Sequence, residues 1–201
     1  MTTTIPFIIP GNLKGYKIIL GSNSPRRKML MEGAGLTFEV RILEGIDETY
    51  PETVKKPDVA LYLAQKKMGA YLTTLEEDEL LITADTIVYV GGEILGKPSG
   101  REEAIAMLET LRGRTHEVIT GVCIATKRKW VSFSVTTNVN LSSMSDEDII
   151  YYVDNYHPYD KAGAYGIQEW IGYVAAEGIE GSFYNVMGLP IERVYKELSL
   201  F

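Results

Sequence analysis

Residues 17–27 read KIILGSNSPRR: a short apolar run, a turn of small residues, and then Pro-Arg-Arg. The run at 17–20 is typical of a buried strand. Ser24 is a good N-cap for a helix, and Pro25 suits the first helical position because its fixed φ matches the helix and its missing N–H is not needed there. We therefore expect the chain to pass from a buried strand almost directly into a helix.

The rest of the chain repeats this alternation of strand and helix patterns, which indicates an α/β or α+β fold. The helix expected at 57–75 carries apolar residues at spacings of three and four, so one face of it should be buried. Ser145 and Asp148 form a variant of the capping box at the start of another helix. We expect strands at 17–20, 38–43, 80–90, 118–125, 130–141, 170–176 and 183–187, and helices at 25–32, 57–75, 101–111, from Ser145 to before Pro158, and at 189–200.

The charge balance limits the classes of partner. The 201 residues include 20 Lys and Arg against 27 Asp and Glu, a net charge of −7, with 45% hydrophobic residues. This acidic, globular composition argues against non-specific nucleic-acid binding, so a polyanionic substrate would need a local cluster of basic side chains.

The sequence also bears on location and on metal sites. No apolar run approaches the roughly 20 residues of a membrane span, and the apolar stretch at 5–9 has no basic residue before it, as a secretory signal would. The single Cys123 cannot form an internal disulfide, which favours the cytoplasm. With two histidines and one cysteine, the chain lacks the usual ligand sets of a zinc site rich in His or Cys, and such a site is excluded. His116 and His157 are not at metal-ligand spacing, so we expect them to be structural.

The turn at 21–27 is the first candidate for chemistry. Backbone N–H groups of its small residues can face a ligand, and the helix N-terminus adds roughly half a positive charge. Arg26 and Arg27 add forked donors that suit phosphate. The alternative is an ordinary capped helix whose arginines are solvated.

Three carboxylates are candidates for metal binding or proton transfer. Asp85 lies inside the apolar strand at 80–90, where a carboxylate is costly unless it is paired, hydrogen-bonded or bound to a metal. It could be a metal ligand or a general base, or it could make a structural hydrogen bond. Asp47 and Glu48 could supply oxygen ligands to a hard cation such as Mg²⁺, or they could lie in a solvated acidic loop.

Four lysines are weaker candidates, because surface lysines usually serve only solubility. Lys66 and Lys67 lie in the helix expected at 57–75. Lys97 precedes a proline in a turn, and Lys161 opens a glycine-containing loop.

Six blocks in this order resemble the Maf family of nucleoside triphosphate pyrophosphatases, and the resemblance runs from about Tyr16 to Leu200. The blocks are SNSPRR at 22–27, ADTIV at 84–88, GKP at 96–98, GRTHEVITGV at 113–122, DKAGAYGIQ at 160–168 and NVMGLP at 185–190.

The resemblance implies an elongated α/β fold similar to that of inosine triphosphate pyrophosphatases: a mixed sheet with flanking helices and a cleft between two lobes. We expect one such domain at 16–201 after an N-terminal extension at 1–15. The resemblance further implies a homodimer that hydrolyses a nucleoside triphosphate to the monophosphate and pyrophosphate with a divalent cation, Mg²⁺ or Mn²⁺. From the charge, the hydropathy and the single cysteine, we expect a cytoplasmic protein with no membrane or nucleic-acid partner.

By motif position, Asp85 looks like the proton acceptor. Arg26, Thr86 and Gln168 resemble the positions that set base preference in the dTTP/UTP branch, which also takes modified pyrimidine nucleotides. A glutamine amide has a donor and an acceptor, which suits the O4/N3–H edge of uracil or thymine. We expect the remaining positions to hold phosphate (Ser22, Ser24, Arg27, Lys67 and Lys97) and metal (Glu48 together with Asp85).

Two alternatives stay open. The first is a house-cleaning pyrophosphatase for purine nucleotides or for 7-methyl-GTP. The second is a non-catalytic inhibitor of septum formation, the role in cell-division arrest that the family's historical name suggests, and the two roles could coexist with the dTTP/UTP activity.

Overall fold

A computed structural model of the chain describes residue 13 and residues 15–201. The N-terminal extension expected at 1–15 falls, apart from residues 13 and 15, outside the described residues. In the described part, seven strands form one mixed sheet in the order β2-β1-β3-β5-β6-β7, and β4 pairs separately with β3. The strands are β1 (Lys17–Leu20), β2 (Phe38–Val40), β3 (Glu79–Val90), β4 (Glu93–Leu95), β5 (Thr115–Ala125), β6 (Trp130–Leu141) and β7 (Ala176–Glu180).

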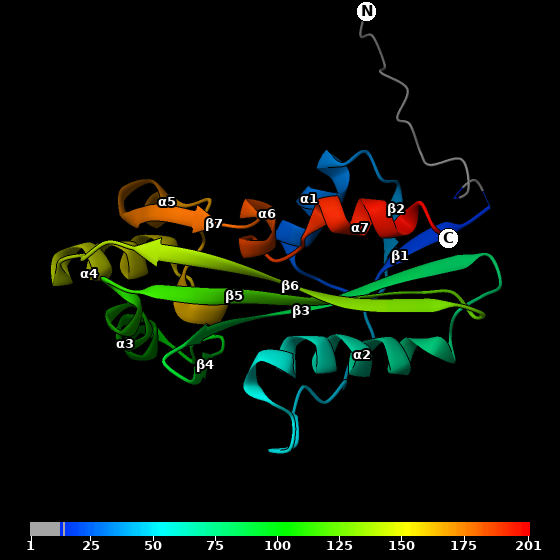
Figure 1. Cartoon of the computed structure of the whole chain (residues 1–201), viewed down its shortest axis with the longest axis horizontal. Coiled ribbons are helices and arrows are strands. Elements are labelled where there is room, and N and C mark those ends of the chain that lie inside the picture. The colour runs from blue at the N-terminus through cyan, green and yellow to red at the C-terminus, as the bar shows by residue number, and fades with distance from the viewer. Residues whose placement is uncertain (1–12, 14) are drawn as a thin grey trace, which may run out of the picture.

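Helices cover both faces of this elongated sheet (Figure 1). In Figure 1, α2 and α3 lie on one side of the long strands, and α1, α6 and α7 lie on the other. The helices are α1 (Pro25–Gly33), α2 (Val59–Leu72), α3 (Arg101–Leu111), α4 (Asp146–Tyr156), α5 (Trp170–Ala175), α6 (Phe183–Val186) and α7 (Ile191–Leu198), with short 3₁₀ turns η2 (Lys56–Asp58) and η3 (Ala162–Ala164).

The long strands β3, β5 and β6 run the length of the molecule and join two groups of elements (Figure 1). β1, β2, α1 and α2 lie toward one end, and β4, α3, α4 and α5 lie toward the other. The α/β class, the mixed sheet and the flanking helices expected from the sequence are confirmed.

The pairing of β3 leaves a gap in one edge of the sheet. β5 pairs with β3 along residues 81–89 on one edge. On the other edge, β1 pairs only with residues 79–82 and β4 only with residues 88–90. Residues 83–87 of β3 therefore face a break between β1 and β4. Asp85 and Thr86, at the middle of this break, are the partly exposed members of a run that is otherwise buried from Leu80 to Val88.

Alternation along β3 sends its side chains to opposite faces of the sheet. Leu81 packs with Ala64, Met68 and Tyr71 of α2, so the odd-numbered positions of this strand face that helix. Leu80 belongs to the main core, on the other face. Asp85 therefore points toward α2, and Thr86 points toward the opposite face.

α2 lies unusually close to the sheet because β5 carries a glycine beneath it. A Cβ atom placed on Gly121 would lie 2.4 Å from backbone atoms of Ala60 and Leu61 in α2. Gly121 is also the register partner of Asp85. This contact therefore sets the distance between the helix that carries Lys67 and the strand that carries Asp85.

Most expected elements are present, and two expected strands are wrong. Residues 170–176 and 183–187 were expected as strands, but Trp170–Ala175 and Phe183–Val186 are helical, and the strand of this region is Ala176–Glu180 between them. Short apolar runs do not distinguish a buried strand from a helical turn by periodicity alone. Here the side chain of Ser182 caps α6 by accepting from the Asn185 N–H, and β7 pairs with β6.

Smaller differences concern the ends of elements. The strand expected at 38–43 ends at Val40, and the helix expected at 57–75 is α2, preceded by η2 and ending at Leu72. The short strand β4 was not expected.

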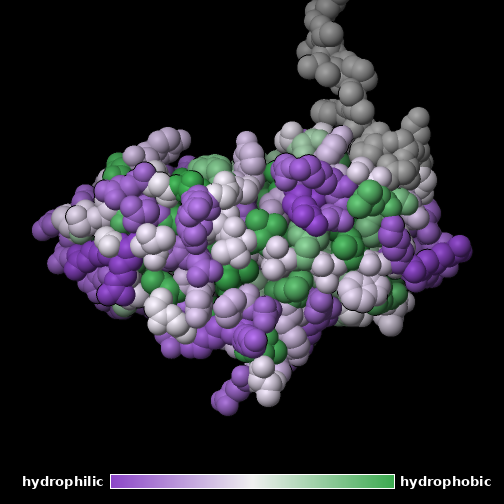
Figure 2. All heavy atoms as spheres, viewed as in Figure 1, coloured by the Kyte–Doolittle hydropathy of each residue, from purple (hydrophilic) through white to green (hydrophobic). Residues whose placement is uncertain are grey.

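Figure 2 shows polar and apolar side chains interspersed over the visible face, as on most folded domains. None of the helices in the described part of the chain has the length and apolar character needed to cross a bilayer.

We predict that Gly121→Ala destabilises the protein, because the new methyl group meets helix backbone that cannot rotate away. Overpacking of this kind costs about 1–3 kcal/mol. The measurement is the free energy of unfolding in urea. Gly69→Ala is the matched control, because Gly69 lies exposed in α2 with open space around it and alanine favours helix there by about 1 kcal/mol. Equal stability of the two variants would contradict the close packing of α2.

Candidate active site

A cavity of about 570 Å³ lies at the break in the edge of β3. The turn after β1, the loop after β2, helix α2, strand β3, the 160–165 segment and the 186–188 loop all contribute to its wall. The expected site residues that line it are Ser22, Ser24, Arg26, Arg27, Glu48, Lys67, Asp85, Thr86 and Lys97. Nine of the ten expected site residues, drawn from the whole first half of the chain, thus meet in one place.

The centre of the site is an ion-paired triad. The Lys67 ammonium donates to Asp85 Oδ1 at 2.6 Å and lies 2.9 Å from Glu48 Oε1. Both members of the inner pair are well covered, since the Lys67 and Asp85 side chains are 13% and 15% exposed. The carboxylate anticipated within an apolar strand is therefore mostly covered and paired, as its position requires.

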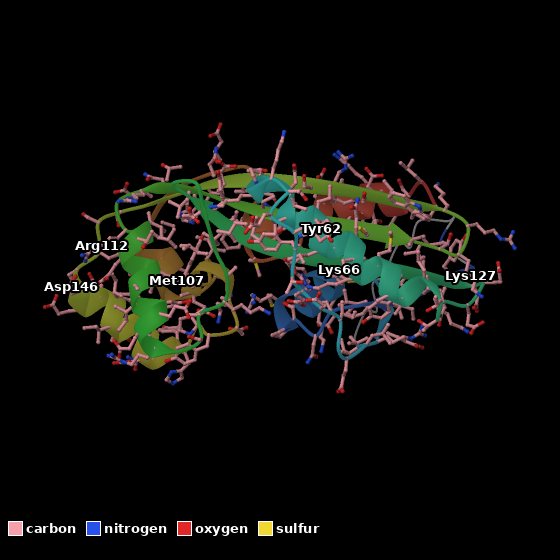
Figure 3. The ribbon with its side chains drawn as sticks, turned by 90° about the horizontal axis from the view of Figure 1, so that it is seen from below. Tyr62, Lys66, Met107, Arg112, Lys127 and Asp146 are labelled. Carbon is pink, nitrogen blue, oxygen red and sulfur yellow. The ribbon has the colours of Figure 1, made fainter. Side chains whose placement is uncertain are left out.

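The neighbouring lysine of α2 has a different partner. Lys66 donates to Asp47 Oδ2 at 2.8 Å and to the Thr49 carbonyl at 2.9 Å. Figure 3 shows where Lys66 lies on α2. Successive helix residues are about 100° apart, so only one of the two can face β3. The structure places Lys67 there.

The charges around Glu48 change the pKa of its carboxyl group. Burial acts to raise the pKa of Glu48, but the hydrogen bond and charge of Lys67 outweigh it, and the charges of Lys97 and Arg27 act in the same direction. The net effect lowers the pKa of this carboxyl from its ordinary value. Glu48 is therefore an anion at neutral pH.

The turn at 21–27 has the geometry expected from its sequence. The Ser24 side chain accepts from the Arg27 N–H, and Pro25 begins α1. Ser22 Oγ accepts from the Ser24 N–H at 3.3 Å. A Cβ atom on Gly21 would lie 3.0 Å from Thr83, so the chain can pass this close to β3 because it has a glycine there.

The Arg27 side chain is fixed by hydrogen bonds to the protein, so most of its donors are not free to bind a phosphate. Four of its five N–H donors point to acceptors of the protein: the Gly188 and Ala84 carbonyls at 2.8 and 2.9 Å, and the Ser22 and Thr86 hydroxyls at 3.0 and 3.2 Å. Ala84 is at the unpaired edge of β3, so Arg27 fills part of the break that β1 and β4 leave. Burial lowers the pKa of Arg27, and the charge of Asp85 opposes that effect.

The three positions expected to set base preference differ in their surroundings. The Arg26 guanidinium reaches Asp160, with NH1 2.6 Å from Oδ2. The Thr86 hydroxyl lies between Arg27 and Thr120, 2.9 Å from the Thr120 hydroxyl. Gln168 is not among the described residues that line the cavity, and its side-chain Oε1 is buried without a hydrogen-bond partner in the described structure.

The donor set fits a divalent cation that a substrate helps to bind. The described residues contain no group of three or more His, Cys, Asp or Glu side chains able to hold a metal ion by themselves. Glu48 and Asp85, however, converge on a single cationic atom, Lys67 Nζ. Mg²⁺ is commonly held by one or two carboxylates together with substrate phosphates, and two converging carboxylates match that pattern.

Several residues of the cavity wall were not predicted as site residues from the sequence, among them Asp160, Tyr165 and Gly188. Asp160 could have been noticed because it immediately precedes Lys161 at the start of a glycine-containing loop. Tyr165 is buried, and its hydroxyl lies 2.7 Å from Nε2 of the buried His116. Burial lowers the pKa of His116 to about 4, so this histidine is neutral at pH 7 and serves to fix the wall.

Comparison with known proteins gives consistent results. The profile of the family described as "Maf-like protein" matches residues 17–201. A dTTP/UTP pyrophosphatase of Parabacteroides distasonis is 56% identical over 190 residues, covering 94% of this chain and 98% of the relative. Another dTTP/UTP pyrophosphatase, from Phocaeicola vulgatus, is 54% identical over 187 residues, covering 93% of this chain and 97% of the relative.

Among solved structures, a HAM1 protein from Coxiella burnetii is similar with a TM-score of 0.45 and 13% sequence identity, covering 92% of this chain and all of the HAM1 chain.

We predict that Arg27→Lys lowers the free energy of unfolding by about 2–4 kcal/mol, because lysine keeps the charge and loses the fork that joins α1, β3 and the 186–188 loop. Urea unfolding measures it. Arg193→Lys is the control, since Arg193 is half exposed and pairs with Glu197 within one helix, where a pair contributes at most about 1 kcal/mol. An Arg27→Lys protein as stable as the control would show that this guanidinium is not a structural tie.

Proposed function

Because this chain belongs to the Maf family, we propose that it hydrolyses dTTP and UTP to the nucleoside monophosphate and pyrophosphate. Relatives that are 51–56% identical over nearly the whole chain carry the name dTTP/UTP pyrophosphatase, which supports this substrate pair. The observation that carries the proposal is the ion-paired Asp85–Lys67–Glu48 cluster in a cavity whose other charged side chains are mostly cationic.

The charge of the cavity suits a triphosphate although the whole protein is acidic. Its lining has five cationic and three anionic side chains, an excess of two positive charges in a protein of net charge −7. A pair of unit charges 4 Å apart contributes about 4 kcal/mol at an effective dielectric constant of 20, so a few close contacts outweigh the distant repulsion. The cations are Arg26, Arg27, Lys67, Lys97 and Lys161, and the anions are Glu48, Asp85 and Asp160.

Asp85 is the residue we assign as general base. Lys67 donates to Oδ1, so Oδ2 is the oxygen that accepts a proton from the attacking water. The water oxygen forms a bond to the α-phosphorus, and the bond from that phosphorus to the bridging oxygen of the β-phosphate breaks. Pyrophosphate leaves with both electrons of that bond, and the charge that develops on it is stabilised by Lys67 and Lys97.

We assign the turn at 21–27 to phosphate binding. The side chains of Ser22 and Ser24 fix its shape through hydrogen bonds to the backbone. Arg27 holds this turn against β3 and contributes its positive charge, with one of its N–H donors left for a phosphate oxygen. Binding at a helix N-terminus with fixed donors favours an anion without a large cost in reorganisation.

A divalent cation, Mg²⁺ or Mn²⁺, would be held by Glu48 and Asp85. When bound, it would neutralise charge on the phosphates and polarise the phosphorus centre. Arg26, Thr86 and Gln168 are the residues we assign to base preference. The homodimer, the cytoplasmic location and the effect on septum formation stay predictions.

We predict that the purified protein releases pyrophosphate from dTTP and UTP in preference to dCTP, ATP, GTP and 7-methyl-GTP. Asp85→Asn should lower kcat by about 10²–10⁴-fold, the usual contribution of a positioned general base. The control is Asp78→Asn, because Asp78 forms an exposed pair with Lys17. A preference for a purine nucleotide would contradict the substrate assignment, and near-normal turnover by folded Asp85→Asn would remove this carboxylate from the chemistry.

The two adjacent lysines of α2 provide a matched comparison. Lys67→Ala should lower kcat/KM for dTTP by about 10²-fold or more, because it removes a fixed cation at the reacting centre and leaves two carboxylates unpaired. Lys66→Ala should keep activity within a few-fold of the wild type, because Lys66 contacts the loop at 47–49. Steady-state kinetics measures both variants. Equal losses of kcat/KM in the two variants would contradict the assignment of Lys67, rather than Lys66, to the active site.

A further inference from the structure

A third carboxylate, Asp160, lines the cavity between two cations. Arg26 NH1 lies 2.6 Å from its Oδ2, and Lys161 Nζ lies 2.9 Å from its Oδ1. Arg26 comes from α1, and Asp160 comes from the segment between α4 and η3. The three groups therefore form a row, cation–carboxylate–cation, in which each carboxylate oxygen faces a different cation.

Asp160 has the charge and the spare lone pairs to bind a further donor. Burial acts to raise its pKa, but the hydrogen bonds of Lys161 and Arg26 outweigh burial and bring the pKa to about 2, so the group is an anion at pH 7. A carboxylate has about four acceptor sites, and these two cations use two of them. The Asp160 side chain is 52% exposed, whereas Arg26 and Lys161 are 18% and 9% exposed, so a ligand in the cavity can reach the carboxylate.

A second set of contacts, made by residues outside the row, holds Lys161 in place. Lys161 Nζ also lies 3.0 Å from Glu169 Oε1. The Tyr152 hydroxyl, on α4, donates to Glu169 and accepts from the Gly166 N–H. A site whose groups are fixed by their own partners before the ligand arrives can discriminate between ligands by hydrogen-bond pattern.

The pattern of the row is donor–acceptor–donor, because Arg26 and Lys161 can only donate and an ionised Asp160 can only accept. Uracil and thymine have the complementary edge, acceptor–donor–acceptor, in O2, N3–H and O4. We propose that Asp160 is a specificity-determining residue that accepts the N3–H of uracil or thymine while Arg26 and Lys161 donate to the two flanking carbonyl oxygens. This inference rests on the proposed function, and it assigns the base reading to a residue outside the expected trio.

The same row rejects the other bases. Cytosine has an unprotonated N3 and an exocyclic amine, so it places an acceptor against the carboxylate and a donor against a cation. Adenine makes the same two mismatches. Guanine matches the carboxylate with N1–H but places its exocyclic amine against a cation. A site built for a set of polar contacts loses much affinity when they are left unmade.

The first test needs no variant. Wild-type protein is assayed for pyrophosphate release from dTTP and from N3-methyl-dTTP, in which a methyl group replaces the hydrogen on N3. We expect kcat/KM to be at least about tenfold lower for the methylated nucleotide, the effect of leaving a charged acceptor without its donor. Equal use of the two nucleotides would overturn the role of Asp160. Failure to hydrolyse unmodified dTTP and UTP would instead contradict the proposed function itself.

The second test changes the acceptor. Asp160→Asn can present an amide donor to cytosine, so we expect the ratio of kcat/KM for dTTP to that for dCTP to fall at least about tenfold. Asp154→Asn is the matched control, because Asp154 pairs with Arg101 at 2.6 Å between α3 and α4, away from the cavity, and the ratio should stay unchanged. A similar fall for every nucleotide, with unfolding in urea like that of the wild type, would mean that Asp160 only ties two segments together and would overturn the proposal.

Discussion

The site depends on one incomplete edge of a strand. β1 and β4 pair with the two ends of β3 on the same side and leave residues 83–87 without a strand beside them. Backbone groups at such an edge need other partners, and Arg27 supplies one by donating to the Ala84 carbonyl. Because consecutive residues of β3 point to opposite faces, the break gives one ligand access to Asp85 on the α2 face and to Thr86 on the other.

The sequence predicts the local parts of this arrangement better than the long-range ones. Ser24, Pro25 and the 17–20 run identify a strand, a turn and a capped helix because each acts over a few residues. The pairing of Arg26 with Asp160 joins residues 134 positions apart, so no local pattern indicates it. The same limit explains why 170–176 and 183–187 were misassigned: pairing of β7 with β6 decides which part of that region is extended.

The candidate site was largely predictable, and its internal contacts were not. Family motifs identify many of the residues that line the cavity, but they do not show that Arg27 directs most of its donors to the protein or that Gln168 is not among the described lining residues. The contacts of Arg27 follow from the burial of its guanidinium. A guanidinium in a crowded position must satisfy its N–H groups with whatever acceptors are nearest, and here they are the Gly188 and Ala84 carbonyls and two hydroxyls.

The cavity wall has two parts, one near the reacting phosphorus and one proposed to contact the base. This division affects how related enzymes can come to prefer different nucleotides. Groups near the reacting phosphorus come from β3, α2 and the loop after β2. The contact at Gly121 holds α2 against the sheet, and Lys67 of α2 pairs with both Asp85 and Glu48. In the row at Asp160, the carboxylate and Lys161 belong to the connecting segment after α4, which is supported by Glu169 and by Tyr152 of α4, whereas Arg26 belongs to α1. Exchange of that segment between related chains would therefore change two of the three groups proposed to read the base and leave the hydrolytic machinery in place.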